Sequence, residues 1–250
     1  MTQITRRTFG QKTLGSVMTF SLLEAIYAHD AFADAVKPIT AKWLAELNEL
    51  GQSVKDEKIE QIQWQQQCES LFARVNLPDL LKFVNFEKLA QEVKFRDRGE
   101  TSLRRPFPEV DGLPTRLVFG HQIFALNEGR SVVPHGHDNM ATGFLVLQGD
   151  FHGRHYERLA DEGQTHMIIK PSIDESFTVG QYSTVSDHKD NVHWFKATSR
   201  KAFLFNIHVS GIEAGRGSGR IYIDPSGEKL SGGRIRARRL NSKEAKDLYG

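Results

Sequence analysis

The residues best suited to chemistry are histidines that fall in two segments. His135 and His137 are two positions apart, and His193 begins a later apolar run. In a β-strand, residues i and i+2 point to the same face, so His135 and His137 would present two imidazoles to one space. Converging neutral imidazoles bind first-row divalent metals. We therefore predict a metal site formed by these three histidines. His188, which lies in a polar run, is the less favoured alternative to His193.

The segment that must hold these histidines is rich in short strand-like runs. After about residue 98, apolar runs alternate with Gly, Pro, Asp and Asn, without intervening helical periodicity. This pattern is typical of an antiparallel sandwich or a small barrel. The expected strands cover residues 116–126, 143–147, 151–156, 166–170, 177–179, 192–195 and 202–209.

The residues that precede this region predict helices. From about residue 37 to 95, apolar residues recur at three- and four-residue spacing, which is typical of amphipathic helices. Gly51 is expected to end the first helix as a C-cap, a second helix to begin near Asp56, and Pro78 to open a third segment. Cys68 has no histidine nearby in the sequence, so we expect a packed thiol rather than a nucleophile.

The C-terminal segment is basic. In Arg234, Arg236 and Arg238, arginines alternate with small apolar residues, so a strand there would have one cationic face. We expect a solvated edge strand protected by its charge. Binding of an acidic ligand or a lipid headgroup is the alternative.

The overall composition is that of one globular domain of ordinary size. The chain has 250 residues, 39% of them hydrophobic, and a formal net charge of +2. So small a charge gives no basic field, and no nucleic-acid partner is expected. The single cysteine excludes an intramolecular disulfide and a zinc ribbon.

The N-terminus carries the features of an export signal. Arg6 and Arg7 precede a weakly apolar stretch over residues 13–28, and Ala33 and Ala35 each close an A-x-A motif. This combination is similar to a twin-arginine signal peptide, cleaved near Ala33 or Ala35 after the twin-arginine translocation machinery delivers the folded protein to the periplasm. The stretch is too short and polar for a stable membrane span. An ordinary amphipathic helix is the alternative.

The chain is therefore expected to have four segments. Residues 1–35 form the signal peptide, and 36–98 form a helical region that packs on the barrel. Residues 99–214 form the β-barrel, and 215–250 form the basic β tail.

The histidine segments resemble the two motifs of the cupin superfamily. The spacing His135-x-His137-x4-Thr142-x6-Gly149 resembles the first motif, in which glutamate usually stands where this chain has Thr142. Residues 180–193 resemble the second motif, with a longer turn. The chain therefore looks most similar to three-histidine cupins, and among them to the cysteine dioxygenase-like thiol dioxygenases. The resemblance implies a mostly β, jelly-roll-like cupin barrel (a double-stranded β-helix) with an N-terminal helical layer.

The same resemblance implies a mononuclear non-haem Fe(II) site that uses O₂ to oxidise a small thiol or a related acidic substrate. Three neutral imidazoles leave the ion its full charge and three open positions, and other divalent transition metals fit the same ligands. His208 matches the family's histidine that hydrogen-bonds near the metal. Arg104, or Arg105 beside it, matches the arginine that binds the substrate carboxylate. Thr142 is also expected to bind substrate.

Two positions depart from this family's pattern. Ser210 stands where the family has a tyrosine that assists oxygen chemistry, and Thr142 stands where animal members have a cysteine linked to that tyrosine. Either Tyr156, Tyr182 or Tyr222 substitutes, or the chemistry differs. A non-catalytic periplasmic cupin that binds a small acidic ligand is therefore the alternative to an oxygenase. An isomerase or decarboxylase that uses the metal only as a Lewis acid is a third class.

The twin-arginine hypothesis predicts the effect of a conservative double substitution. Replacing Arg6 and Arg7 together by lysine should retain the full-length precursor in the cytosol, because the translocation machinery reads the arginine pair and not its charge alone. Cell fractionation and precursor size on a gel measure this. Continued export of the double variant, with processing equal to that of the unaltered chain, would contradict the hypothesis.

Overall fold

The structure is a computed structural model that describes residue 37 and residues 39–250. The signal peptide expected over residues 1–35 lies outside the described residues. Within the described part of the chain, no helix is both long and apolar enough to cross a membrane.

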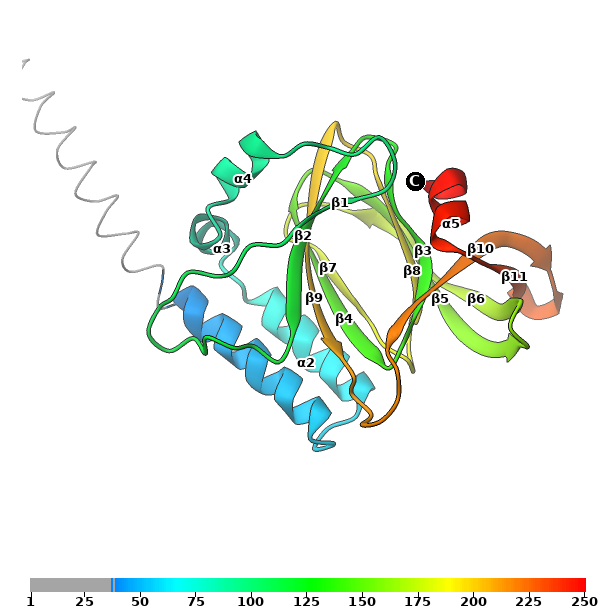
Figure 1. The fold of residues 1–250 in the computed structure, drawn as a ribbon, viewed down its shortest axis with the longest axis horizontal. Coiled ribbons are helices and arrows are strands. Elements are labelled where there is room, and N and C mark those ends of the chain that lie inside the picture. Colours follow the sequence, from blue (N-terminus) through cyan, green and yellow to red (C-terminus); the bar gives the residue numbers. More distant parts are fainter. Residues whose placement is uncertain (1–36, 38) are drawn as a thin grey trace, which may run out of the picture.

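Two antiparallel β-sheets form the body of the molecule (Figure 1). The first is an open sheet in the order β1-β2-β9-β4-β7, and the second closes into a barrel in the order β10-β11-β6-β5-β8-β3. The open sheet comprises β1 (Thr101–Leu103), β2 (Gly120–Asn127), β9 (Lys201–Ser210), β4 (Met140–Gln148) and β7 (Tyr182–Val185). The barrel comprises β10 (Gly219–Lys229), β11 (Ile235–Leu240), β6 (His166–Phe177), β5 (Phe151–Glu162), β8 (Val192–Ala197) and β3 (Ser131–Asp138). The mostly β, jelly-roll-like barrel expected from the sequence is confirmed.

Successive side chains along the strands of the open sheet point to opposite faces, one toward the second sheet and one toward the helices. In β4, Thr142 and Phe144 line a pocket between the sheets, whereas Ala141 and Leu145 belong to the apolar cluster under the helices. This is the two-residue period of a strand buried on both faces. The open sheet therefore presents a mixed polar and aromatic face to the pocket and an apolar face to the helices.

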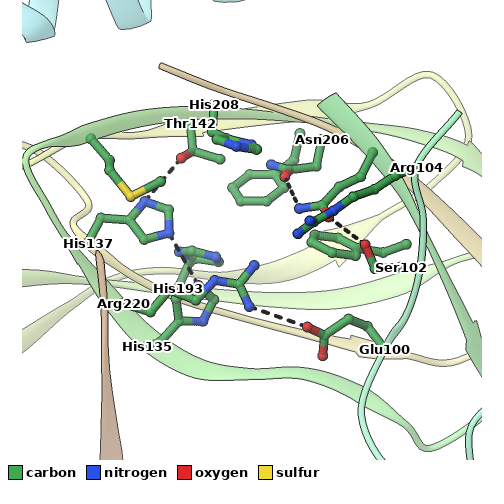
Figure 2. A pocket seen from close by; sticks show the side chains of 14 residues that line it. Glu100, Ser102, Arg104, His135, His137, Thr142, His193, Asn206, His208 and Arg220 are labelled. Carbon is green, nitrogen blue, oxygen red and sulfur yellow. Dashed lines mark hydrogen bonds and ion pairs between the residues drawn. The ribbon is translucent and has the colours of Figure 1, made fainter. Parts of the chain in front are cut away.

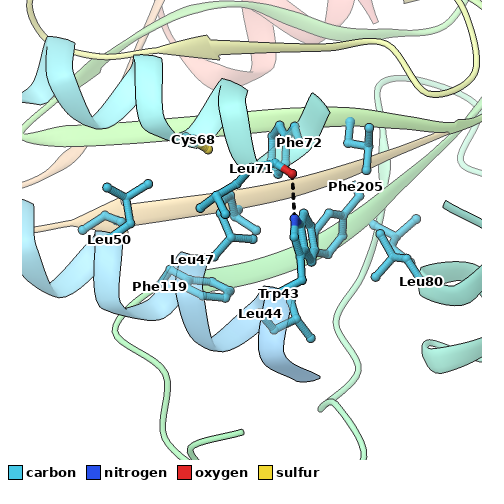
Figure 3. Packing of buried hydrophobic residues seen from close by; sticks show 14 of the residues in the cluster. Trp43, Leu44, Leu47, Leu50, Cys68, Leu71, Phe72, Leu80, Phe119 and Phe205 are labelled. Atoms are coloured by element: carbon cyan, nitrogen blue, oxygen red, sulfur yellow. Dashed lines mark hydrogen bonds between the residues drawn. The ribbon is translucent and has the colours of Figure 1, made fainter. Parts of the chain in front are cut away.

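The N-terminal helices cover the outer face of the open sheet (Figures 1 and 3). Residues 39–55 form the first helix, and α2 (Gln61–Ala73) begins with a capping box between Glu60 and Gln63. Two short helices follow, α3 (Leu77–Phe83) and α4 (Phe86–Glu92). Trp43 on the first helix donates from Nε1 to the Leu71 carbonyl oxygen at 2.8 Å, which joins that helix to α2 within the apolar cluster (Figure 3). The expected helical layer is confirmed.

Two helix boundaries differ from those expected. The first helix continues through Gly51 to residue 55. A Cβ at Gly51 would lie 2.9 Å from Val118 Cγ2 and 3.3 Å from Val209 Cγ2, so this glycine serves close packing on the sheet and is not a C-cap. The third helical segment is also divided in two, because Asn85 takes a left-handed conformation (φ 50°) between α3 and α4.

The arginine-rich C-terminal strand is not an edge strand. β11 lies between β10 and β6, and β10 pairs with β3, so these two strands close the barrel. Arg236 pairs with Glu162 and Arg238 with Glu244, so acidic partners on neighbouring elements neutralise the cationic face. The sequence pattern showed which residues share a face, but not which strands lie beside them. The chain ends in α5 (Ser242–Tyr249), which packs on β3.

A glycine in β4 sets how closely α2 approaches the open sheet. A Cβ at Gly143 would lie 2.9 Å from Phe72 Cε2 and 3.1 Å from Cys68 Sγ, and both of these side chains are buried on α2. Cys68 is thus a packed thiol, as expected. No side chain larger than hydrogen fits at position 143 without moving the helix.

Gly143→Ala should therefore destabilise the protein by about 1–3 kcal/mol, the usual cost of overpacking a filled core. Thermal or denaturant unfolding measures the change in the free energy of unfolding. Gly217→Ala is the matched control, because a Cβ there meets nothing within 4 Å. Equal stability of the two variants would refute this account of the helix–sheet contact.

Candidate metal centre

Strand pairing brings His135, His137 and His193 together. His135 and His137 lie two positions apart on β3, and His193 on β8 is the cross-strand partner of His135. All three side chains are buried, and their ligand nitrogens lie within 4.8 Å of one another. The expected convergence of three imidazoles is observed. His188 instead lies exposed in the loop after β7.

Hydrogen bonds behind two of the rings determine which nitrogens face the centre. His135 Nδ1 lies 2.8 Å from the Val133 carbonyl oxygen, which can only accept, so Nδ1 of the neutral ring carries the proton. His137 Nδ1 lies 3.0 Å from Thr142 Oγ1. The Nε2 atoms of His135 and His137 then face each other at 3.2 Å. Such outer hydrogen bonds orient metal-binding histidines.

His193 provides a test of whether these residues fit a cation. Neither His193 Nδ1 nor Nε2 has a hydrogen-bond partner among the described residues, although both atoms are buried. An unpartnered buried polar atom costs about 1–3 kcal/mol. In the metal-free protein, His137 Nε2–H can donate to His135 Nε2 across their 3.2 Å contact, whereas the His193 nitrogens have no such partner among the described residues. A divalent transition-metal ion between the rings would offer a partner to a nitrogen of each, so the donor set fits such an ion.

Burial keeps the three rings neutral. It lowers the pKa of His135 and His193 well below the ordinary value and lowers the pKa of His137 to about 3. The positive charge of Arg220 lowers all three pKa values further. Neutral imidazole is the form that binds metal, so protons do not compete for these nitrogens near pH 7.

A pocket of about 210 Å³ adjoins the three histidines (Figure 2). Pockets for drug-sized ligands are about 300 Å³ or larger, so this one suits a smaller molecule. The barrel supplies the three histidines and Arg220, and the open sheet supplies most of the opposite wall. The lining residues are Glu100, Ser102, Arg104, Gln122, Phe124, His135, His137, Met140, Thr142, Phe144, His193, Asn206, His208 and Arg220.

His208 lies in this pocket on β9, directly opposite Thr142 on β4. Its ring lies over Gly120 on β2, where any Cβ would overlap it. Burial lowers the pKa of His208 to about 4, and the charges of Arg220 and Arg104 act in the same direction. His208 is therefore a neutral donor and acceptor near the three histidines. Thr142, expected to bind substrate, lines the pocket but also bonds to His137.

Arg104 lines the pocket and is held in place by a chain of hydrogen bonds through side-chain amides. Its Nε donates to Gln122 Oε1 at 3.3 Å, and Gln122 Nε2 donates to Asn206 Oδ1 at 3.0 Å. Asn206 Nδ2 in turn donates to the Gly143 carbonyl oxygen at 3.3 Å. This chain ties the guanidinium to three strands of the open sheet. Arg105, the alternative to Arg104, lines a separate apolar cavity.

Sequence reasoning missed five polar residues of this pocket, namely Glu100, Ser102, Gln122, Asn206 and Arg220. Gln122 and Asn206 are polar residues within apolar strands, and that break in the apolar pattern was the available signal. Glu100 and Arg220 gave no local signal, because they meet only when β10 pairs with β3. They form an ion pair at 3.3 Å within the pocket lining.

The tyrosines considered as substitutes for the one missing at Ser210 lie outside the pocket lining. Tyr156 packs in the apolar interior of the barrel, and Tyr182 packs against Phe72 of α2. Tyr222 is the cross-strand partner of His135, with the two ring centroids 5.8 Å apart, and it packs with the apolar cluster around α5. No tyrosine is among the described residues that line the pocket.

The remaining histidines have structural surroundings. His121 bonds to the Arg105 carbonyl oxygen and stacks on Phe107, with ring centroids 3.8 Å apart. His152 faces outward and pairs with Asp174. His155, on the other face of β5, is buried as the cross-strand partner of His193, and burial lowers its pKa to about 4.

Comparisons with known proteins bear on the fold alone. No family model and no curated protein matches the sequence. A cupin superfamily protein from Desulfitobacterium hafniense DCB-2 is 16% identical, with a TM-score of 0.32 over 49% of this chain and 87% of that chain. An uncharacterized conserved protein with a double-stranded β-helix domain, from Klebsiella pneumoniae, is 11% identical, with a TM-score of 0.35 over 52% and 84%. The 11S globulin procruciferin of Brassica napus is 14% identical, with a TM-score of 0.35, and the match spans 52% of this chain and 28% of that one.

The buried neutral histidines predict how stability depends on pH. A histidine whose folded-state pKa lies below its unfolded value of about 6.5 stabilises the fold fully above that pH and loses its contribution as the pH falls. The metal-free protein should therefore unfold more easily between pH 7 and pH 5. The limiting slope is about 1.4 kcal/mol per pH unit for each such histidine.

Chemical denaturation at a series of pH values measures this dependence. The control is a His135→Gln/His193→Gln variant, which lacks two of the titrating groups and should show a shallower slope. A free energy of unfolding that stays constant from pH 7 to pH 5 would contradict the assigned neutral state.

Proposed function

We propose that this protein is a metal-dependent oxygenase that uses mononuclear Fe(II) and O₂ to oxidise a small thiol or a related acidic substrate. One observation carries the proposal. Three buried, neutral imidazoles converge at a small pocket, and neither nitrogen of His193 has a hydrogen-bond partner among the residues that the structure describes. When bound, the ion would supply a Lewis acid with positions open to both substrate and O₂.

The chain's own residues have distinct tasks in this proposal. His135, His137 and His193 hold the ion. His208 is neutral and lies in the pocket, so it can donate or accept one hydrogen bond to a bound ligand. Arg104 presents a guanidinium that suits a substrate carboxylate.

The remaining wall of the pocket favours a dry site. Phe124 and Phe144 line it from the open sheet, and Met140 completes the apolar part. Apolar walls exclude water, which strengthens each charge–charge contact within the site.

We also propose that the protein acts in the periplasm after export as a folded chain. The twin-arginine pattern of residues 1–35 supports this location. A fold that holds its ligands on separate strands suits metal loading before export. Cys68 is a buried, unpaired thiol, so disulfide formation in the oxidising compartment is not required for folding.

A second candidate function is non-catalytic binding of a small acidic ligand. It is favoured by the composition of the pocket, where no tyrosine is found among the described residues. Ser210, at the position of the family's tyrosine, contacts Lys55 through its backbone oxygen. A metal and an arginine are sufficient to hold an anion without turnover.

Substitution of the histidines tests the metal site. His193→Ala and His135→Ala should each lose stoichiometric iron, because two remaining imidazoles hold a divalent ion far more weakly than three. Metal content per folded chain measures this after anaerobic loading with Fe(II) and gel filtration. His166→Ala, on the partly exposed end of β6, is the matched control and should retain the metal.

Oxygen consumption separates the two candidate functions. The iron-loaded protein should consume O₂ with at least one member of a panel of small acidic thiols, and His193→Ala should not. Stoichiometric iron without O₂ uptake with any thiol would favour the binding function. Retained iron in His193→Ala would overturn the site itself.

A further inference from the structure

A second guanidinium shares the pocket with Arg104. Arg104 follows β1 at the edge of the open sheet, and Arg220 lies on β10 of the barrel, in register with His137. Both line the cavity, and Figure 2 shows their guanidinium groups entering it from different elements. Arg220 is the cross-strand partner of His137 and shares the pocket lining with His208 of the open sheet.

Neither guanidinium is saturated by protein acceptors. Within the described part of the chain, Arg104 bonds only to Gln122 Oε1, through Nε. Arg220 bonds only to Glu100 Oε1, through Nη1, at 3.3 Å. A guanidinium carries five N–H donors, so each group keeps most of its donors for a ligand. Gln122 and Glu100 thus hold the Arg104 and Arg220 guanidinium groups in place and leave most of their N–H donors available.

The pocket has more positive than negative charge. Among the described residues that line it, Arg104 and Arg220 are the cations, Glu100 is the only carboxylate, and the histidines are neutral. The remaining lining side chains are uncharged. The lining therefore has an excess of about one positive charge, and a divalent ion at the histidines raises it to about three. Uncompensated charge in a partly buried site is costly, so a ligand that brings more than one negative charge is favoured.

We propose that this pocket binds a small molecule with two carboxylate groups, one on the Arg104 fork and one on the Arg220 fork. The inference rests on the proposed function, because it specifies the substrate class of the same site. Planar guanidinium forks match carboxylates in two-point contacts. Arg104 is held by Gln122 and Arg220 by Glu100, so each guanidinium has its own anchor and can take an acceptor group of its own. The cavity of about 210 Å³ limits the molecule to a short carbon chain.

Binding of succinate and butyrate tests this directly. Both have four carbons, but succinate has two carboxylates and butyrate one. Calorimetry with the metal-loaded protein at pH 7 should give at least a tenfold tighter dissociation constant for succinate, since a charge-assisted hydrogen bond contributes that much or more. Inorganic phosphate, the compact doubly charged anion, should bind more weakly than succinate.

Two variants assign the second carboxylate to Arg220. Arg220→Gln/Glu100→Gln removes both members of the ion pair, so that no buried carboxylate is left unpaired, and should abolish the preference for succinate. Arg104→Gln should also reduce it, because each variant leaves one fork. Arg234→Gln, which removes an exposed arginine outside the pocket, is the control and should bind like the unaltered protein.

Metal content of the same samples separates the two proposals. Iron-loaded protein that binds succinate and butyrate equally would overturn the two-carboxylate inference and leave the proposed function standing. Preference for succinate that survives Arg220→Gln/Glu100→Gln, or phosphate that binds more tightly than succinate, would also overturn it. Protein without iron that still prefers succinate tenfold would support the inference while the proposed function fails.

Discussion

The site depends on one constraint: imidazole nitrogens removed from water must find a partner. The His193 nitrogens have none among the described residues, and the Nε2 atoms of His135 and His137 face each other at 3.2 Å. Burial opposes protonation of these rings, so protonation does not relieve the arrangement. A cation bound between the three rings would give a nitrogen of each a partner. The local structure favours this arrangement, because Val133 and Thr142 hydrogen-bond to the Nδ1 atoms of His135 and His137 and leave the Nε2 atoms of both rings facing the centre.

The two sheets divide the chemistry between them. The barrel supplies the three histidines, while the open sheet supplies His208 and the amide chain that ends at Arg104. Closure of the barrel also adds Arg220 to the site, because the pairing of β10 with β3 places Arg220 beside His137. A ligand in the pocket therefore touches both sheets. The affinity for such a ligand depends on how the two sheets pack together as well as on the residues that contact the ligand.

Local patterns in the sequence predicted much of the fold and the centre of the site. His135 and His137 were assignable because the two-residue period of a strand is local, and His193 because it opens an apolar run. Features that depend on distant pairing were not predictable. β11 was expected at an edge because alternation identifies a face but not a neighbour. Gly51 was read as a helix end because a glycine used for close packing has the same local signature as a C-cap.

The helical layer takes part in the site although none of its described residues lines the pocket. On β4, Thr142 faces His137, and the next residue, Gly143, faces Phe72 and Cys68 of α2. On the inner face, the absence of a side chain at Gly120 on β2 leaves room for the His208 ring on β9. On the outer face, apolar residues of the same two strands, such as Ile123 and Ile207, pack under the helices. The outer face of the open sheet is thus packed to contact distance against the helices, while its inner face lines the pocket. A shift of the helices would move Thr142 and His208 relative to the barrel, so the N-terminal helices hold one wall of the pocket at a fixed distance from the histidines on the other.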